Sequence, residues 1–506
     1  MVFKNKICAV VAATGARAMR RQLDAALRTR HSTIELRLDW LKDDAEIARF
    51  LHQLAGRAAS RGERSARPRV SLIATCRRQS AGGKYRGSIA KQLVHLSQAL
   101  ASGCHWYDLE IESIRECPRQ LLDVLLGEGR RLASAHFFRR APRNPGAVVR
   151  QLAGTQSHAI KVAAQCHSLA DGLRLLRITG PRRNFVSVPM GDAALPLRVL
   201  APREGSALSY APVENVTAPG QVSLEEMTRL YRADRLDRRT RVYAIIGNPV
   251  FHSLSPVMQN AGFQARHMNA VFLPFLVRAL PDFLAAIQPL KIAGFSVTLP
   301  HKQAILRHLD GCDPLATAIG AVNTVVVRGG GKLYGYNTDY VGVLRALEPR
   351  IPLRESRVLI VGAGGAARAV AFALAQAGSA VCICARRRNR AAVLAKAVNG
   401  EMIRRDRLRS EFFDAIVNAT PVGMFPHIQS SPLKARDLNC RLVFDTIYRP
   451  RVTRLMQLAK RRGIETISGV EMFVVQGTAQ WEIWTGERAP ERVTRQAVLR
   501  ALDEKP

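Results

Sequence analysis

A lysine inside an apolar run is the most reactive feature of the first half of the chain. Lys161 stands within Ala159-Ile-Lys-Val-Ala163, a run that predicts a buried strand. A buried lysine is costly unless it is neutral or paired, and burial together with nearby cations lowers its pKa. Because a neutral amine can add to a ketone, this position predicts nucleophilic imine chemistry.

Other charged or titratable side chains occur at the ends of neighbouring apolar runs. Glu35 and Arg37 are two residues apart on one run, so they face the same way. Each residue taken alone fits a snorkelling or salt-bridged side chain. Six such residues at the same end of successive strands favour a functional site instead. The six are Glu35, Arg37, Arg77, His136, Lys161 and Arg198.

The elements that must position these residues alternate between strand and helix. Helix-like stretches, such as residues 19–30, 45–61 and 89–102, lie between most of the strand-like runs. Eight β-then-α units favour a small parallel (β/α)8 barrel. Periodicity alone leaves a doubly wound sheet as the alternative, and both folds place their chemistry at the carboxyl ends of the strands. The strand-like runs span residues 7–13, 33–41, 70–77, 106–112, 131–137, 159–164, 185–190 and 207–212.

These motifs resemble those of type I 3-dehydroquinate dehydratases across roughly residues 5–222. The resemblance implies that Lys161 forms an imine with the substrate ketone, and that His136 removes a neighbouring proton and later protonates the departing hydroxyl. It implies that Arg198 pairs with the substrate carboxylate through a planar bidentate fork. The residues implied to hold the remaining substrate groups are Glu35, Arg37, Arg77, Thr217 and Gln221. The matching stretches are Glu35-Leu-Arg-Leu-Asp39, Ser134-Ala-His136, Ile160-Lys-Val-Ala163, residues 190–198 and Ala218-Pro-Gly-Gln221.

One position departs from the pattern of that family. The family has an acidic residue just before a Gly-Gly pair, where this chain has Ala81-Gly-Gly83. The acidic residue normally orients and polarises the catalytic histidine, so its loss is expected to weaken the rate more than to change the mechanism. The rival interpretation is a barrel that no longer catalyses and serves a structural or regulatory role.

In the second half, a lysine and a carboxylate form a plausible acid/base pair. Lys302 follows the run Gly294-Phe-Ser-Val-Thr-Leu-Pro-His, which predicts a strand leading into a helix, and Asp339 closes Gly335-Tyr-Asn-Thr-Asp339. When hydride reaches a ketone carbon, the oxygen becomes an alkoxide that needs a proton. A lysine ammonium can stabilise and protonate it, and a nearby carboxylate fixes the lysine's position and charge. Alone, Lys302 would fit a solvated helix residue.

A dinucleotide-binding turn follows. Arg357-Val-Leu-Ile-Val-Gly362-Ala-Gly-Gly-Ala-Ala367 predicts a strand, a glycine turn and a helix, the context that makes a G-x-G-x-x-A motif informative. The next predicted strand, Val381-Cys-Ile-Cys384, is followed by arginines and no acid, which favours the 2′-phosphate of NADP over NAD. A solvated basic turn is the alternative for any one arginine. The predicted cofactor contacts are Gly362, Ala363, Gly364, Gly365, Ala366, Arg386, Arg387, Asn418, Thr420, Met424 and Gly469.

Residues from about 241 to 503 resemble shikimate dehydrogenases. The resemblance implies that Lys302 and Asp339 are the catalytic pair. Serine at both 253 and 255 favours shikimate over quinate, by resemblance alone. Ser296 is a mild departure, because many relatives have asparagine there. The residues implied to contact the substrate are Ser253, Ser255, Thr298, Asn323, Thr338, Asp339, Tyr448 and Gln476.

The two halves imply consecutive steps of one pathway on an α/β chain with a Rossmann-type NADP lobe. The expected division is a (β/α)8 barrel over residues 1–225, a linker over 226–240, a shikimate-binding lobe over 241–342, an NADP-binding lobe over 343–468, and C-terminal helices over 469–506 that pack back on the substrate lobe. The charged run from Glu225 to Arg239 predicts a solvated helix and connector. Trp481 and Trp484 are expected to be core anchors.

Composition narrows the partners and the location. The net charge of +36 raises a nucleic-acid hypothesis, but the arginines are dispersed and no aromatic-interleaved basic module occurs, so small anionic substrates are expected instead. No apolar run reaches the roughly 18 residues of a membrane span. We expect no signal peptide and no metal site. Nine cysteines without regular spacing favour a reducing cytoplasm.

Overall fold

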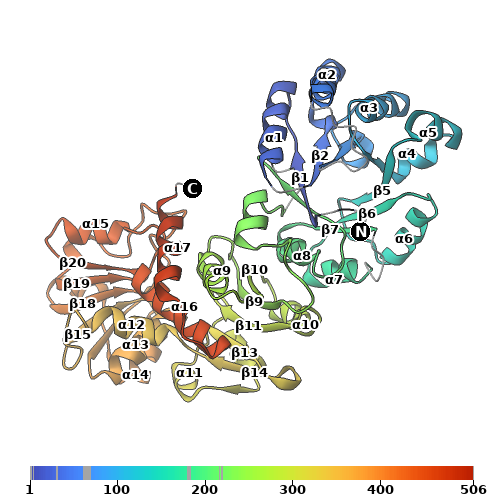
Figure 1. Cartoon of the computed structure of the whole chain (residues 1–506). Helices are drawn as coiled ribbons and strands as arrows, with labels where there is room; N and C mark the ends of the chain where they lie inside the picture. Colours follow the sequence, from blue (N-terminus) through green and yellow to red (C-terminus); the bar gives the residue numbers. More distant parts are fainter. Residues whose placement is uncertain are drawn as a thin grey trace. The chain divides into compact units, whose positions relative to one another are not determined.

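The chain divides into two compact units. The computed structural model describes residue 3 and residues 5–29, 32–60, 70–178, 184–215, 217 and 220–504. The first unit comprises Met1–Thr240 with Pro281–Pro289, and the second comprises Arg241–Leu280 with Leu290–Pro506. Figure 1 shows the first unit in blue to green, and the second unit from green through yellow to red.

The first unit is a nearly closed parallel barrel. Its strands follow the order β7-β6-β5-β4-β3-β2-β1-β8, and every bonded pair is parallel. Where β7 meets β8, the amide of Ala207 donates to the carbonyl of Phe185 at 2.8 Å. The prediction of a (β/α)8 barrel is therefore confirmed over the doubly wound alternative. The strands are β1 (Ile7–Val11), β2 (Thr33–Arg37), β3 (Ser71–Thr75), β4 (Trp106–Glu110), β5 (Arg130–Phe137), β6 (Ala159–Gln165), β7 (Phe185–Met190) and β8 (Ser209–Pro212).

Helices follow the strands around the barrel. Two of the predicted strands run on into helices: the backbone forms a 3-10 helix at Leu38–Trp40, and α4 begins directly after Glu110. An apolar run alone does not distinguish a strand from a buried helical turn, which is why both ends were misplaced. Residues 30 and 61, which closed two predicted helices, lie outside the described residues. The helices are α1 (Ala16–Arg28), α2 (Asp44–Ser60), α3 (Ile89–Ala101), α4 (Ile111–Glu116), α5 (Arg119–Leu126), α6 (Pro145–Ala153), α7 (Leu169–Arg177) and α8 (Leu195–Leu200).

The alternation along β6 directs Lys161 into the barrel. Ala159 and Ala163, two residues to either side, belong to a buried cluster that also contains Trp106 and Tyr210. The intervening Val162 belongs to a different cluster, which includes residues of α6. Because side chains alternate along a strand, Lys161 shares the face of the two alanines. The sequence pattern therefore places a charged group in an otherwise apolar interior.

The segment after the barrel differs from the expected solvated helix. It contains a five-residue π-helix at Glu226–Leu230 instead of a regular exposed helix. Met227, Tyr231 and Ala233 are buried, although charged residues surround them in the sequence. The expectation was wrong because it weighed the charges and overlooked the spaced apolar residues between them.

The first lobe of the second unit is a mixed sheet. Its six strands follow the order β10-β9-β11-β13-β14-β12, in which β13 runs antiparallel to both neighbours. The helix that was predicted to begin near Lys302 is replaced by turns at residues 299–303 and a short 3-10 helix at Ala304–His308. The strands are β9 (Arg241–Gly247), β10 (Ala270–Leu276), β11 (Ile292–Val297), β12 (Gly311–Cys312), β13 (Thr324–Val327) and β14 (Leu333–Tyr336), and the helices are α9 (Ser255–Ala265), α11 (Pro314–Ile319) and α12 (Asp339–Leu347). The intervening α10 (Leu280–Leu290) belongs almost entirely to the first unit.

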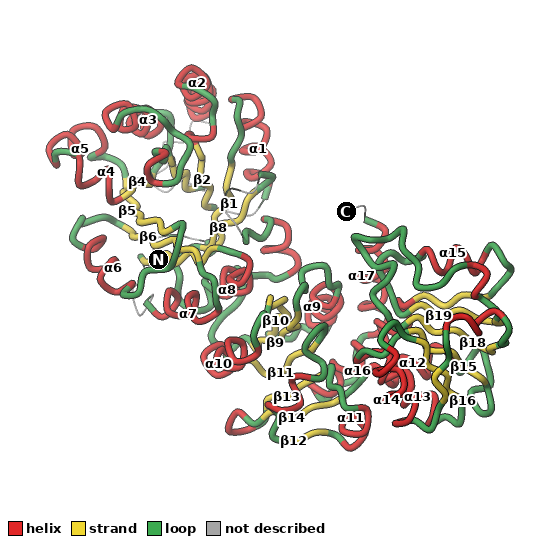
Figure 2. The backbone as a smooth tube through the Cα atoms, turned by 180° about the vertical axis from the view of Figure 1, so that it is seen from behind, coloured by secondary structure: helices red, strands yellow, loops and turns green. Residues whose placement is uncertain are grey.

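The second lobe is a doubly wound parallel sheet. The strand order β17-β16-β15-β18-β19-β20 reverses direction between β15 and β18, which is the switch point at which such sheets bind dinucleotides. Helices α12, α13, α14 and α16 cover one face, and α15 covers the other (Figure 2). The buried side chains of these two groups belong to two separate clusters. The elements are β15 (Arg357–Val361), α13 (Gly365–Gln376), β16 (Ala380–Cys384), α14 (Arg388–Ala397), β17 (Glu401–Met402), β18 (Phe413–Asn418), β19 (Cys440–Asp445), α15 (Arg454–Lys460), β20 (Glu465–Ser468), α16 (Gly469–Thr485) and α17 (Glu491–Asp503).

Two tryptophans of α16 pack on the mixed sheet and α9. The Trp481 ring lies 4.6 Å from that of Phe263, and the Trp484 ring lies 5.4 Å from that of Tyr243. Trp484 also donates its Nε1 hydrogen to the carbonyl of Val325 at 3.0 Å. Helix α16 therefore ties the late part of the second unit's sequence to its first strands and α9. Among the described residues, no helix is long and apolar enough to cross a membrane.

Trp484→Ala should destabilise the second unit by about 3–5 kcal/mol, because it removes a buried ring and leaves the Val325 carbonyl without its donor. Native-state hydrogen exchange of the α16 amides would measure this change separately from the barrel. Val393→Ala, at a helix position that is 65% exposed, serves as the control and should change little. Unchanged α16 protection in Trp484→Ala would contradict the anchoring role.

Candidate active sites

Lys161 lies in a buried charge cluster inside the barrel. Its Nζ atom contacts Asp108 Oδ2 directly and lies 3.8 Å from Glu35 Oε1. Arg77 Nη2 lies 3.1 Å from the same Asp108 oxygen, as an ion pair without hydrogen-bond alignment. Neither Lys161 nor Asp108 could be buried alone at a tolerable cost, so each requires the other.

Asp108 is a site residue that the sequence reasoning missed. Burial alone would raise the pKa of its carboxyl, but the ammonium of Lys161 and the guanidinium of Arg77 hold the pKa well below its usual range. Ser134 Oγ donates to the second carboxylate oxygen at 2.6 Å. The signal was available, since Asp108 and Glu110 stand two apart within an apolar run, as Glu35 and Arg37 do.

Arg198 has a buried guanidinium that is only partly hydrogen-bonded within the described residues. Its Nε donates to the carbonyl of Pro189 at 2.8 Å, while Nη1 and Nη2 are buried and meet no hydrogen-bond partner in the described part of the chain. Burial without a carboxylate beside it lowers the pKa of Arg198 to about 10. A buried fork with two free nitrogens matches the geometry of a carboxylate ligand.

His136 lacks the acceptor that a catalytic histidine commonly has. Its Nδ1 atom is buried and has no hydrogen-bond partner among the residues described. Ala81, at the position of the family's acidic residue, is buried and offers no polar side-chain atom. The ring instead stacks on Phe138, with centroids 5.9 Å apart. Burial and the charges of Arg77 and Lys161 lower the pKa of His136, so the imidazole is neutral near pH 7.

The remaining predicted barrel residues lie on β2 and in the segment after β8. Arg37 makes a bidentate pair with Asp39 at 2.9 and 2.8 Å, and Thr75 Oγ1 donates to Glu35 at 2.8 Å. After β8, Thr217 donates its backbone and side-chain hydrogens to Gln221 Oε1, so these two predicted residues contact each other. Ala218 and Pro219 of the same motif lie outside the described residues.

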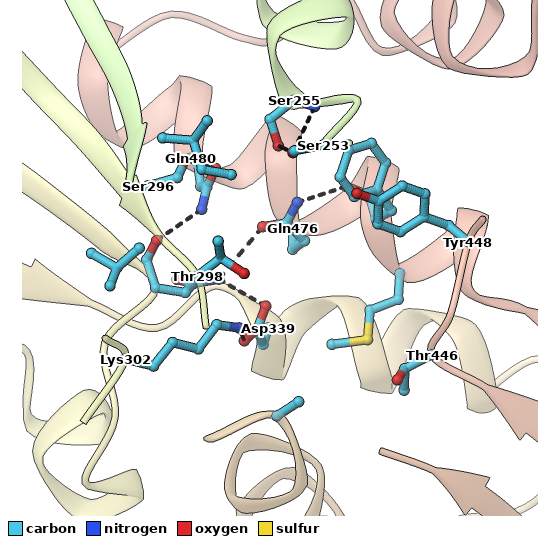
Figure 3. A pocket seen from close by; sticks show the side chains of 16 residues that line it. Ser253, Ser255, Ser296, Thr298, Lys302, Asp339, Thr446, Tyr448, Gln476 and Gln480 are labelled. Carbon is cyan, nitrogen blue, oxygen red and sulfur yellow. Dashed lines mark hydrogen bonds and ion pairs between the residues drawn. The ribbon is translucent and has the colours of Figure 1, made fainter. Parts of the chain in front are cut away.

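The second site is a cavity of about 170 Å³ lined mainly by polar side chains. Figure 3 shows Ser253, Ser255 and Tyr448 on one side of Gln476, and Lys302 with Asp339 across from them. The structure therefore brings together most of the predicted substrate contacts. The predicted residues that line the cavity are Ser253, Ser255, Thr298, Lys302, Asn323, Asp339, Tyr448 and Gln476; Ser296, Thr446, Met472, Phe473 and Gln480 also line it.

A buried amide network holds the acid/base pair. Lys302 Nζ donates to Asp339 Oδ2 at 2.5 Å, and Asn323 Nδ2 donates to the other carboxylate oxygen at 2.8 Å. Thr338 lies behind the lining, where its amide donates to Asn323 Oδ1 at 2.8 Å. Thr338 thus orients Asn323 instead of facing the cavity. The network leaves Asp339 as a fixed acceptor for Lys302.

A second cavity, of about 710 Å³, follows the glycine turn at the switch point. Gly362 has a φ of +125°, and a Cβ there would lie 2.9 Å from the Ala419 carbonyl, so this turn requires glycine. Two predicted residues lie outside the lining: Asn418 is fully buried, and Gly469 packs against the backbone of Thr446. The predicted residues in the lining are Gly362, Ala363, Gly364, Gly365, Ala366, Arg386, Arg387, Thr420 and Met424, and it also includes His252, Arg390 and Arg449, which were not predicted.

The two cavities meet at Lys302. This residue lines both cavities, as do Thr298, Ala366, Thr446 and Tyr448. A Cβ on Gly365 would lie 3.2 Å from Lys302 Cβ, so the glycine allows the lysine to pass close to the cofactor turn. A small polyhydroxylated ring in the first cavity and a dinucleotide in the second would therefore share a wall that carries the proton donor.

Family models match the chain in four successive stretches. The type I 3-dehydroquinase model covers residues 7–238, and the shikimate dehydrogenase substrate binding domain covers residues 245–325. The shikimate/quinate 5-dehydrogenase model covers residues 346–422, and the shikimate 5′-dehydrogenase C-terminal domain covers residues 469–499.

Known proteins resemble the whole chain or its second half. The chloroplastic bifunctional 3-dehydroquinate dehydratase/shikimate dehydrogenase of Arabidopsis thaliana is 33% identical over 96% of this chain and 83% of its own length. A shikimate dehydrogenase (NADP(+)) of Bacillus mycoides is 44% identical over 49% of this chain and 93% of its own. A solved shikimate 5-dehydrogenase from Thermus thermophilus, in complex with NADP(H) and shikimate, is 36% identical and covers 52% of this chain and 100% of that chain, with a TM-score of 0.48.

Asp108→Asn should destabilise the barrel by about 3–5 kcal/mol, because it removes the carboxylate that lies nearest to two buried cations, Lys161 and Arg77. Hydrogen exchange of the β6 amides would measure the loss. Asp123→Asn is the matched control, since Asp123 pairs with Arg119 on an exposed helix face and should contribute less than 1 kcal/mol. Equal protection in the two variants would contradict the structural need for this ion pair.

Proposed function

The chain belongs to the family of bifunctional 3-dehydroquinate dehydratases/shikimate dehydrogenases, and from this premise we propose which residues perform its two reactions. The family unites a lyase and an NADP-dependent oxidoreductase that act in sequence in the shikimate pathway. We assign the first reaction to Lys161 and His136 in the barrel. We assign the second to Lys302 and Asp339 in the second unit.

In the barrel, Lys161 adds to the ketone of 3-dehydroquinate and water leaves as the imine forms. His136, neutral because burial and neighbouring cations lower its pKa, accepts a proton from the carbon next to the imine. The electron pair released there moves towards the imine nitrogen, and the departing hydroxyl takes the proton back from His136. Water then hydrolyses the imine, so the net change is the loss of one water.

Arg198 supports the assignment of this reaction to the barrel. Its two unpartnered, buried Nη atoms are costly in a site that binds nothing, since unsatisfied buried charges destabilise a fold. A substrate carboxylate would satisfy both nitrogens. A barrel retained only as scaffold would gain nothing from this arrangement.

In the second unit, NADPH supplies a hydride to the ketone carbon of 3-dehydroshikimate when it is bound. Lys302 donates a proton to the oxygen, which becomes the new hydroxyl, and Asp339 holds the ammonium in place. Arg386 and Arg387 are proposed to bind the 2′-phosphate, because they line the cofactor cavity beyond the glycine turn and no acid follows β16. The single observation that carries this assignment is that Lys302 lines both cavities.

A second candidate function is a dehydrogenase with an inactive barrel. The observation that favours it is the pairing of Ala81 with an unpartnered His136 Nδ1. Without an acceptor at Nδ1, neither the tautomer nor the tilt of the ring is fixed by a hydrogen bond. We prefer a slowed dehydratase, since the lysine, the histidine and the carboxylate-binding arginine all remain.

The finer organisation follows from the same reasoning. We propose that the domain divisions lie near residues 225, 240, 342 and 468. We also propose that nucleic acid is not a partner and that the protein works in the cytoplasm. All nine cysteines are free, which supports a reducing compartment. Dispersed arginines support the attraction of small anions over a nucleic-acid interface.

The purified chain should consume NADPH when given either 3-dehydroquinate or 3-dehydroshikimate. Lys161→Met should abolish consumption from 3-dehydroquinate and leave that from 3-dehydroshikimate intact, because only the barrel forms the imine. Lys302→Met should reduce NADPH consumption from both substrates by at least 100-fold. The variant should still dehydrate 3-dehydroquinate, which the absorbance of the conjugated product would show. A wild-type chain that uses 3-dehydroshikimate alone would establish the inactive barrel instead.

Ala81→Glu should raise kcat for dehydration roughly tenfold or more, because a carboxylate can accept from His136 Nδ1 and fix the ring. The negative charge should also raise the pKa of His136, so the acid limb of the pH–rate profile should move to higher pH. Ala81→Gln, of similar size but uncharged, is the control and should not move that limb. A kcat for Ala81→Glu at or below the wild-type value would show that the ring is already well placed.

A further inference from the structure

Asp445, at the end of β19, is a fully buried carboxylate that lies outside both cavity linings of the second unit. Three donors converge on it. Asn418 Nδ2 and the Ile447 amide donate to Oδ1 at 3.0 and 3.1 Å, and Thr453 Oγ1 donates to Oδ2 at 2.6 Å. Burial raises the pKa of Asp445 to about 6, so the group is mainly ionised at neutral pH and acts purely as an acceptor.

The Asn418 contact leads to the cofactor cavity. Asn418 ends β18, and its own Oδ1 accepts from the amide of Thr420 at 3.0 Å and from Thr420 Oγ1 at 2.7 Å. Thr420 lines the cofactor cavity, whereas Asn418 does not. Asp445 thus fixes the amide that in turn fixes the loop facing the dinucleotide.

The Ile447 contact leads to the shared wall of the two cavities. Ile447 is flanked by Thr446 and Tyr448, and both of these line both cavities. The Tyr448 ring stacks on Phe473 of α16 with centroids 4.2 Å apart. The Thr446 Oγ1 atom donates to the Asn418 carbonyl at 2.9 Å, so the two loops are also bonded to each other.

We propose that Asp445 is a positioning residue that holds the cofactor loop at Thr420 and the substrate wall at Tyr448 in one arrangement. The inference rests on the proposed function of the second unit. A single oxygen, Oδ1, carries the connection to both loops, while Oδ2 is bonded away from them, to the Thr453 hydroxyl that caps α15. The roles of the two carboxylate oxygens can therefore be tested separately.

The test compares three variants of the full chain. Asp445→Ala removes both oxygens, Thr453→Val removes only the donor to Oδ2, and Asp445→Asn keeps an oxygen that can serve Asn418 and Ile447 while the Thr453 hydroxyl turns. The measurements are the Kd of NADP from titration calorimetry without substrate, and kcat and KM for shikimate oxidation. Amide hydrogen exchange of residues 418–424 and 446–450 reports loop order directly.

Asp445→Ala should raise the NADP Kd and the shikimate KM about tenfold each and should increase exchange in both loops. Thr453→Val and Asp445→Asn should stay within about threefold of wild type in both constants, even where their melting temperatures fall. If Asp445→Ala does not fold, Asp445→Ser, which keeps one short hydroxyl, carries the same expectation. Folded Asp445→Ala or Asp445→Ser with wild-type Kd and KM would overturn the proposal, as would an equal loss of affinity in Thr453→Val.

The wild-type chain separates this proposal from the proposed function. If it binds NADP and oxidises shikimate, the function of the second unit stands, and the variants decide the role of Asp445 alone. If it does neither, the proposed function of the second unit is wrong. The hydrogen-exchange comparison of the two loops then still decides whether Asp445 orders them.

Discussion

A charge buried in a protein interior must be compensated by a partner, and both sites of this chain are built around one such pair. Lys161 meets Asp108 inside the barrel, and Lys302 meets Asp339 in the second unit. Each pair costs desolvation energy that a pair of apolar side chains would not. Neighbouring polar groups therefore supply further compensation. In the barrel these are Arg77, which follows β3, and Ser134 of β5, and in the second unit the group is Asn323, which directly precedes the antiparallel strand β13.

Much of the fold could be predicted because its signals are local. The eight apolar runs and the glycine turn after β15 each indicate an element without reference to distant residues. Lys161 was detectable because a charge in an apolar strand is anomalous. Asp108, on β4, carries the same signal, but so does Glu110 two residues further on. Only the fold shows that Asp108 is the one that contacts Lys161.

What could not be predicted depends on tertiary packing. The segment after the barrel looks solvated in sequence, yet its spaced apolar residues are buried. Thr338 and Asn418 stand near other predicted ligand-binding residues, but neither lines a cavity, since Thr338 bonds to Asn323 and Asn418 bonds to Asp445. Adjacency in sequence indicates the right loop and does not indicate which way a side chain points. Gly469 was also predicted to contact the cofactor. Its close packing against the backbone of Thr446 already explains why glycine stands there.

The two lysines have opposite requirements, and their aspartates differ accordingly. In the proposed dehydration, Lys161 attacks the ketone as a neutral amine, which would leave Asp108 without its nearest cation. Arg77 lies 3.1 Å from the same oxygen and keeps the carboxylate compensated when Lys161 becomes neutral. In the proposed reduction, Lys302 donates the proton, and Asp339 has only a neutral amide, Asn323, as its other described side-chain donor. The contact with Asp339 therefore holds the Lys302 side chain in the cavity. The side chain of Lys302 is also 16% exposed, against 4% for Lys161, so solvent can restore its proton after each turnover.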